Sequence, residues 1–197
     1  MTTDLQAGMG VMEAIFQRRS VRQYADRPVD PDTVQKLLTA AVQAPSAMNL
    51  QPWVFAVFHG HKLLREYSER AKQHLVATYP TRFDLHSRAE LYEDPNYDLF
   101  HGADTLIVIY ATWGRLHPNE DCCLAAENLL LAAHGLGLGT CPIGYARPWL
   151  DLPETKRELG VPEQYQAVFP LVVGYPAGPT APTPRDEPNI VSWKWEV

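Results

Sequence analysis

The sequence predicts an α+β or α/β domain in which helices flank one mixed β-sheet. Short runs of apolar, β-branched and aromatic residues, typical of buried strands, alternate with stretches whose apolar residues recur every three or four positions, as in amphipathic helices. With 197 residues, 46% of them hydrophobic and 20% charged, the chain can build one core of ordinary size. We therefore expect a single domain over residues 1–197, with a globular core at about 9–175 and a C-terminal arm at about 176–197.

The first predicted element is a helix over residues 9–19. Its apolar positions follow helical spacing and are Val11, Met12, Ile15 and Phe16. This helix delivers Arg18 and Arg19 near its C-terminal end, and residues 20–24 then look extended.

A second helix is predicted after Asp30, which can cap it, with Pro31 in its first turn. Its apolar face consists of Val34, Leu37, Leu38, Ala41 and Val42. The helix should end by Ala44, because Pro45 disfavours a helical conformation in the residue before it.

Three apolar runs predict buried strands at residues 53–58, 106–110 and 169–175. Pro170 weakens the start of the third, because proline cannot donate a ladder hydrogen bond. Two stretches between the strands predict helices at residues 62–79 and 119–136. The second has apolar residues on most faces, so we expect it to be central and buried together with Cys122 and Cys123.

The end of the chain is rich in proline, which suits an extended arm. Its prolines are Pro176, Pro179, Pro182, Pro184 and Pro188, and an apolar tail follows at Ile190, Val191, Trp193 and Trp195. Leaving these side chains in water would be costly. The tail therefore either packs on its own domain or adds a strand to a partner subunit, and we favour the second.

Charge and composition exclude several classes of function. The formal net charge of −6 gives no general attraction to nucleic acid or to an anionic membrane. The longest apolar runs fall far below the ~20 residues that cross a bilayer, and the N-terminus lacks the features of a secretory signal. Three cysteines, an odd number, fit a reducing compartment. We therefore expect a cytoplasmic protein that engages neither nucleic acid nor membrane.

Two segments predict a site for a planar, anionic ligand. The first gathers Arg18, Arg19, Ser20 and Arg22, and the planar fork of arginine suits a phosphate. The second supplies hydroxyl and amide groups at Ser46, Asn49 and Gln51, which suit the polar edge of a ring. Two arginines alone would more simply complement a helix dipole in water, so the prediction depends on the combination.

A glycine-rich segment, residues 135–144, closes the long apolar helix and then presents a short loop. Glycine lets a backbone approach a flat ligand and point its amides at it, although Gly135 or Gly137 also suits an ordinary helix cap. The segment is not a dinucleotide fingerprint, because it follows a helix instead of joining a strand to a helix.

Other candidate sites are weaker. His59 with His61, and His117 with Glu120 and Asp121, lack the compact spacing of a zinc site, so no metal is predicted. The chain also lacks the Gly-x-Ser-x-Gly motif of serine hydrolases.

Together, the segments resemble the nitroreductase family of FMN-dependent oxidoreductases. The shared motifs are Arg18-Arg19-Ser20-Val21-Arg22-Gln23-Tyr24, Ala44-Pro45-Ser46-Ala47-Met48-Asn49-Leu50-Gln51-Pro52-Trp53, Phe100-His101-Gly102-Ala103, Ala125-Ala126-Glu127-Asn128-Leu129 and Gly137-Leu138-Gly139-Thr140-Cys141-Pro142-Ile143-Gly144. They run over most of the chain and are specific in combination. The resemblance implies a homodimer of α+β subunits with two FMN sites in the interface and the C-terminal tail extending onto the partner.

The resemblance also implies roles for individual residues. Arg18, Arg19, Ser20 and Arg22 would hold the FMN phosphate and pyrimidine side, and Pro45, Ser46, Ala47 and Asn49, with Gln51 nearby, would reach the flavin from the other subunit. Pro142, Ile143 and Gly144 would pass a backbone amide to flavin N5, and Arg185 would complete the phosphate site. The chain departs from the larger members of the family between Tyr67 and Tyr97, where Gln73 is a weak candidate for a flavin contact.

The predicted function is hydride or electron transfer from NADH or NADPH, through bound FMN, to a small electrophile such as a nitroaromatic, a quinone or an enone. A ping-pong cycle is expected because donor and acceptor compete for one face of the ring, and no side chain is assigned a catalytic role because the flavin performs the chemistry. Two alternatives stay open: a specialised enzyme resembling the one that converts FMN to the lower ligand of cobalamin, and a flavin-binding protein without NAD(P)H turnover.

Overall fold

The centre of the structure is a four-stranded sheet with the strand order β1-β2-β4-β3. The computed structural model describes residues 9–78, 92, 94–112, 114 and 116–196. The strands are β1 (Trp53–His59), β2 (Thr105–Ala111), β3 (Gly139–Pro142) and β4 (Gln166–Gly174). The helices are α1 (Val11–Gln17), α2 (Pro31–Ala41), α3 (His61–Thr78), α6 (Pro118–Gly135), α7 (Arg147–Leu150) and α8 (Pro153–Leu159), with short 3₁₀ turns η1 (Ala47–Asn49) and η2 (Gly144–Ala146).

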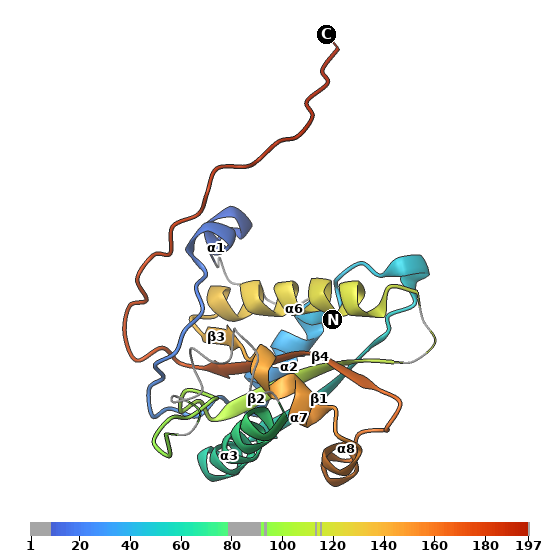
Figure 1. Ribbon diagram of the computed structural model, residues 1–197. Coiled ribbons are helices and arrows are strands. Elements are labelled where there is room, and N and C mark those ends of the chain that lie inside the picture. Colours follow the sequence, from blue (N-terminus) through green and yellow to red (C-terminus); the bar gives the residue numbers. More distant parts are fainter. Residues whose placement is uncertain (1–8, 79–91, 93, 113, 115, 197) are drawn as a thin grey trace.

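The sheet separates two hydrophobic cores (Figure 1). Alternate residues of β2 face α2 and α6 on one side, namely Ile107, Ile109 and Ala111. The others, Leu106, Val108 and Tyr110, face α3 and α7. Because both faces are covered, every residue of β2 is buried, which explains why this strand reads as a continuous apolar run.

The predicted α+β class is confirmed, but the named strands pair only in antiparallel fashion. The chain returns after α3 to the end of the sheet where β1 finished, so that His59 pairs with Thr105 and β2 runs back along β1. In the described part of the chain, the parallel contact is the isolated bridge between Ser20 and Thr140. The predicted mixed sheet is therefore an antiparallel sheet with one parallel bridge at its edge.

The long helix α6 is central, as predicted, and it ends at a glycine cap. Gly137 adopts φ 75°, its N–H donates to the His134 carbonyl at 2.9 Å, and the N–H of Leu138 donates to the Ala133 carbonyl at 2.8 Å. The expectation that both cysteines are buried is wrong for one of them. Cys122 faces the sheet, whereas Cys123, one position later on the helix, is exposed.

The glycine-rich segment was expected to be a loop, but residues 139–142 form the edge strand β3. Gly139 pairs with Gly174 on β4, and both lack a side chain where residues of the 20–24 segment approach. A Cβ at position 139 would lie 2.6 Å from Val21 Cγ2, and one at position 174 would lie 2.7 Å from Tyr24 Cδ1. The two glycines therefore let the arginine-bearing segment pack on the sheet edge.

Strand β4 begins three residues earlier than predicted, at Gln166. The register of β2 and β4 shifts between Ile109 and Tyr110, which places a bulge in β4 close to Pro170. The short helices α7 and α8 were not predicted.

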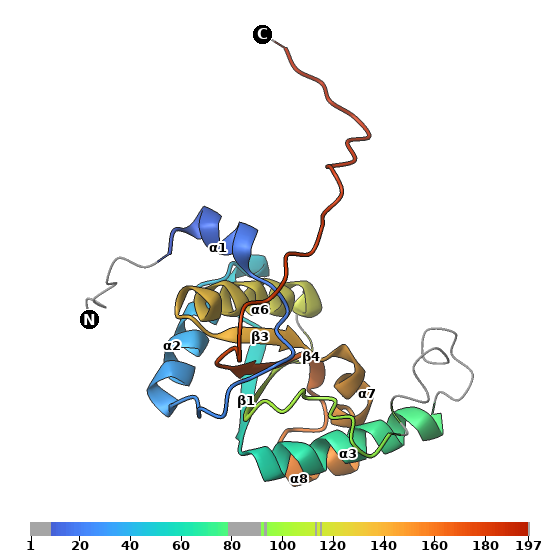
Figure 2. The same ribbon diagram turned by 90° about the vertical axis from the view of Figure 1, so that its left-hand side faces the viewer.

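The C-terminal arm leaves the domain after Pro176, which bridges to Tyr24, and Ala177, whose N–H donates to the Gln23 carbonyl at 3.0 Å. Beyond this point the arm extends away from the domain (Figures 1 and 2). The indole rings of Trp193 and Trp195 stack at 6.2 Å and are 70% and 75% exposed. In the described part of the arm, the tail thus does not pack on its own domain.

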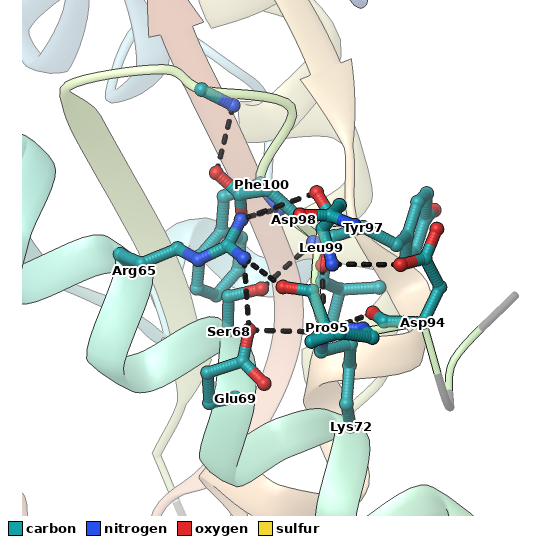
Figure 3. Close-up of polar contacts among 12 residues, drawn as sticks. Arg65, Ser68, Glu69, Lys72, Asp94, Pro95, Tyr97, Asp98, Leu99 and Phe100 are labelled. Atoms are coloured by element: carbon teal, nitrogen blue, oxygen red, sulfur yellow. Dashed lines mark hydrogen bonds and ion pairs between the residues drawn. The ribbon is translucent and has the colours of Figure 1, made fainter.

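A buried lysine joins α3 to the segment that precedes β2. Lys72 is 2% exposed, and its Nζ donates to the carbonyls of Asp94 at 3.1 Å and Tyr97 at 2.7 Å. Its charge is paired with Glu69 at 2.9 Å. Figure 3 shows Arg65, Ser68, Glu69 and Lys72 on α3 pointing toward residues 94–100. The network fixes the start of β2 to α3.

Replacing Lys72 with methionine should lower the free energy of unfolding by about 2–4 kcal/mol, because it leaves two partly buried carbonyls and Glu69 without their donor. Urea unfolding measures the change. Lys62→Met on the exposed face of the same helix is the matched control and should change stability by less than about 0.5 kcal/mol. Equal effects of the two substitutions would contradict the role of the network.

Candidate functional site

The arginine-bearing segment lies along the edge strand β3. The N–H of Val21 donates to the Thr140 carbonyl at 2.9 Å, and Ser20 forms the parallel bridge to the same residue. Because the two segments run in the same direction, Arg18 lies toward the end of α6 and Arg22 lies toward Pro142 and the residues after it. Four extended residues span about 13 Å, so the segment presents two separate groups of donors along one edge.

At one end of this edge, Arg18 and Arg19 line a pocket of about 210 Å³. Its walls are Gln17, Arg18, Arg19, Val21, His134, Leu138, Thr140, Pro176, Gly178, Pro179 and Thr180. Nη1 of Arg19 donates to the carbonyls of Phe16 at 2.8 Å and Arg18 at 2.7 Å. Nε of Arg19 is buried and has no hydrogen-bond partner among the described residues. An unpaired guanidinium donor in a pocket with two positive charges suits an anion such as a phosphate group.

At the other end, Arg22 approaches the turn after β3. Its charge opposes the rise that burial causes in the pKa of the Cys141 thiol, and it reinforces the lowering that burial causes in the pKa of His101. The N–H of Ile143 already donates to the Pro170 carbonyl at 2.8 Å. Of the two amides predicted to serve a ligand here, that of Gly144 is therefore the better candidate.

The predicted loop from Pro45 to Gln51 lies elsewhere, against the first turn of α6. Both carboxylate oxygens of the buried Asp121 accept the N–H of Ala47, at 3.1 and 3.2 Å. The loop keeps its shape through local bonds, since Ser46 Oγ accepts the N–H of Gln51 and the Gln51 amide donates to Asn49 Oδ1. Met48, Asn49 and Gln51 all have positive φ, and Met48 is 81% exposed.

Helix α6 separates these two groups of predicted site residues (Figure 1). Asp121, which holds the loop, and His134, which lines the arginine pocket, are 13 positions apart, or about 20 Å along the axis. One chain therefore brings Arg18, Arg19, Ser20 and Arg22 together with Pro142, Ile143 and Gly144. It does not bring them together with Pro45, Ser46, Ala47, Asn49 and Gln51.

Arg185 lies in the extended arm, where Nη1 donates to the carbonyls of Thr183 at 3.3 Å and Pro184 at 3.0 Å. Its contribution to the phosphate site stays a prediction. The segment from Tyr67 to Tyr97, expected to shape substrate access, falls partly outside the described residues, and Gln73 is exposed on α3.

Sequence reasoning missed two residues of the site, His134 and Asp121. His134 stands in a helix expected to be simply buried, and Asp121 was weighed only as a metal ligand. Across the described ranges, no group of three or more His, Cys, Asp or Glu side chains could hold a metal ion. No helix in the part of the chain that the structure describes is long and apolar enough to cross a membrane.

The fold and the site define an α+β protein with a pocket lined by two arginines at one edge of its sheet. The chain matches the model of the nitroreductase family over residues 15–175. It is 33% identical over 171 residues to a Methanothermobacter thermautotrophicus protein named, provisionally, as an NADH dehydrogenase/NAD(P)H nitroreductase, covering 86% of this chain and 78% of that protein. It is 29% identical over 177 residues to an iodotyrosine deiodinase from Thermotoga neapolitana, covering 87% of this chain and 91% of that protein.

A solved structure is similar over nearly the whole fold. The crystal structure of a nitroreductase with bound FMN from Bacteroides fragilis superposes with a TM-score of 0.79 at 29% identity, covering 94% of this chain and 98% of that one. The chain belongs to the nitroreductase family, and the predicted family and fold class are confirmed.

Proposed function

We propose that this protein binds FMN and transfers hydride from NADH or NADPH to a small electrophilic acceptor in a ping-pong cycle. At the level of the family, the predicted cofactor and the predicted class of enzyme are confirmed. The acceptor, for which a nitroaromatic, a quinone or an enone is proposed, and the ping-pong order are our inference. The three free cysteines support a cytoplasmic location.

The residues at the sheet edge fit FMN. The pocket beside Arg18 and Arg19 is smaller than the roughly 300–1,000 Å³ of whole ligand sites, so it suits the phosphate, and the buried unpaired Nε of Arg19 would donate to it. Arg22, farther along the same segment, would lie at the pyrimidine edge and stabilise negative charge there. The amide of Gly144 would point to the N5 side of the ring. Bound FMN supplies the two-electron chemistry, and no side chain is assigned as acid or base.

The length of α6 is the main support for the proposal that two subunits share the site. About 20 Å of α6 separates the loop from Pro45 to Gln51 from the arginine pocket of the same subunit. If this loop contributes to a flavin site, it must therefore do so at the arginine pocket of a second copy of the chain. Two further features support a homodimer. The apolar face of α1 is exposed, with Phe16 69% accessible to solvent, and the apolar side chains of the C-terminal tail are exposed as well.

Turnover and subunit mixing test the proposal. FMN-loaded protein should oxidise NADH or NADPH with menadione or nitrofurazone, with the parallel kinetic lines of a ping-pong reaction. Two inactive variants, Arg19→Ala and Asn49→Ala, should regain activity when mixed, because a mixed dimer carries one intact site. Random mixing restores roughly a quarter of all sites. Loaded protein without turnover would favour a flavin-binding role or the specialised alternative, and protein that refuses FMN would contradict every flavin function.

The loop should depend on its anchor. Asp121→Ala removes the acceptor of the Ala47 N–H and should weaken FMN binding roughly tenfold, whereas Asp121→Asn keeps a carbonyl acceptor and should lose little. Asp104→Ala is the matched control, since Asp104 is also buried and accepts a backbone N–H, that of Val29 at 3.2 Å. Both alanine variants should lower stability by about 1–3 kcal/mol in urea unfolding. A similar loss of FMN in both would show that the loop anchor has no special role.

A further inference from the structure

The pocket beside Arg18 and Arg19 contains a third nitrogen-bearing side chain, His134, in the last turn of α6. Nε2 of His134 is buried and has no hydrogen-bond partner among the described residues. A buried nitrogen without a partner is unfavourable, so this atom suits a ligand that would pair with it. Two groups in the pocket, Nε2 of His134 and Nε of Arg19, therefore lack partners of their own.

The surroundings of the His134 ring are positive. Burial and then the charges of Arg18 and Arg19 lower the pKa of His134, and Glu13 on α1 opposes this effect. Glu127, on α6 itself, lies 4.0 Å from Arg18. The remaining walls carry no charge and are Gln17, Val21, Leu138, Thr140, Pro176, Gly178, Pro179 and Thr180. The His134 imidazole thus lies beside two cations that favour its neutral form. A bound anion would raise its pKa and favour the protonated form.

We propose that His134 is a third ligand of the FMN phosphate, beside Arg18 and Arg19, and that it takes up a proton when the cofactor binds. This inference rests on the proposed function. A phosphate of about two negative charges accepts a hydrogen bond from Nε2 and favours the charged ring. The pKa of His134 is then higher with FMN bound than without it. Binding consequently takes up a proton, and the affinity for FMN rises as the pH falls toward the pKa of the ring.

A comparison of FMN with riboflavin, which lacks the phosphate, isolates this contact. Apoprotein is titrated with each flavin by fluorescence at about pH 6 and about pH 8, for the wild type and for His134→Gln. The substitution should weaken FMN roughly tenfold near pH 6 and less near pH 8, and leave riboflavin unchanged. The FMN phosphate itself titrates near pH 6, but this affects the wild type and His134→Gln equally. The ratio of their FMN affinities at each pH therefore reports the protonation of the His134 ring.

His61→Gln, an exposed histidine on α3, is the matched control and should bind both flavins as the wild type does. Unchanged FMN affinity of His134→Gln at both pH values would overturn the inference. An equal loss of FMN and riboflavin would overturn it too, because it would show a structural role. Failure of the wild type to bind FMN would overturn the proposed function itself. The titration of wild-type apoprotein with FMN separates this outcome from a failure of the His134 inference alone.

Discussion

Replacing Gly139 with alanine is expected to remove most of the affinity for FMN. The added Cβ would lie 2.6 Å from Val21 Cγ2 and 2.7 Å from Val21 Cβ, closer than real Cβ atoms come to their neighbours. Val21 is 7% exposed, and rotation of its side chain does not move its Cβ. The segment that carries the arginines must therefore move off β3. Overpacking of this kind costs about 1–3 kcal/mol of stability. The loss of FMN affinity should be at least tenfold, because several charge-assisted contacts shift together.

The experiment needs a control glycine and a compensating change. Gly135→Ala, in the last turn of α6, meets nothing within 4 Å and should leave FMN affinity unchanged. Val21→Gly removes the atoms that clash, so the double variant should bind FMN better than Gly139→Ala alone. A double-mutant cycle on FMN affinity and on urea unfolding measures this coupling. Additive effects in the cycle would contradict the proposed contact.

For the candidate site, the sequence indicated which residue types matter but not where one subunit places them. Arg18, Arg19 and Arg22 stand out because they cluster within five residues of a chain whose net charge is −6, and because arginine suits phosphate. The Pro45–Gln51 loop stands out because its amides and hydroxyls suit the polar edge of a ring, and the glycine-rich segment because glycine lets a backbone approach a flat ligand. Strand β3 was missed because Gly-Thr-Cys-Pro has little intrinsic strand propensity, and it is a strand through its pairing with β4.

The two missed residues depend on tertiary position. The roles proposed for Asp121 and His134 arise because the first turn of α6 meets the Pro45–Gln51 loop and its last turn meets Arg18 and Arg19. Periodicity predicted that α6 is buried, but it could not show which segments would meet its ends. The same helix explains why two motifs that look like one site in the sequence lie in two places in one subunit.

Removing the chain from Pro188 onward is expected to convert the proposed dimer largely to monomer. Val191, Trp193 and Trp195 are 96%, 70% and 75% exposed in the single subunit, an apolar surface that monomeric proteins rarely leave in water. Buried tryptophans at interfaces each contribute about 2–4 kcal/mol, so the dissociation constant of the dimer should rise at least a hundredfold. Sedimentation velocity at several concentrations measures the shift.

Point substitutions separate the role of the side chains from the length of the arm. Trp193→Ser with Trp195→Ser should reproduce most of the loss, whereas Lys194→Ser, in the same stretch of the arm, should not. Sedimentation unchanged by truncation would contradict the role of the tail and shift attention to the exposed face of α1 and the Pro45–Gln51 loop as candidate interfaces. FMN affinity should fall together with dimerisation, because a monomer retains the arginine pocket but loses the loop that a second copy would supply. A monomer that binds FMN as tightly as the dimer would show that the arginine edge alone forms the flavin site.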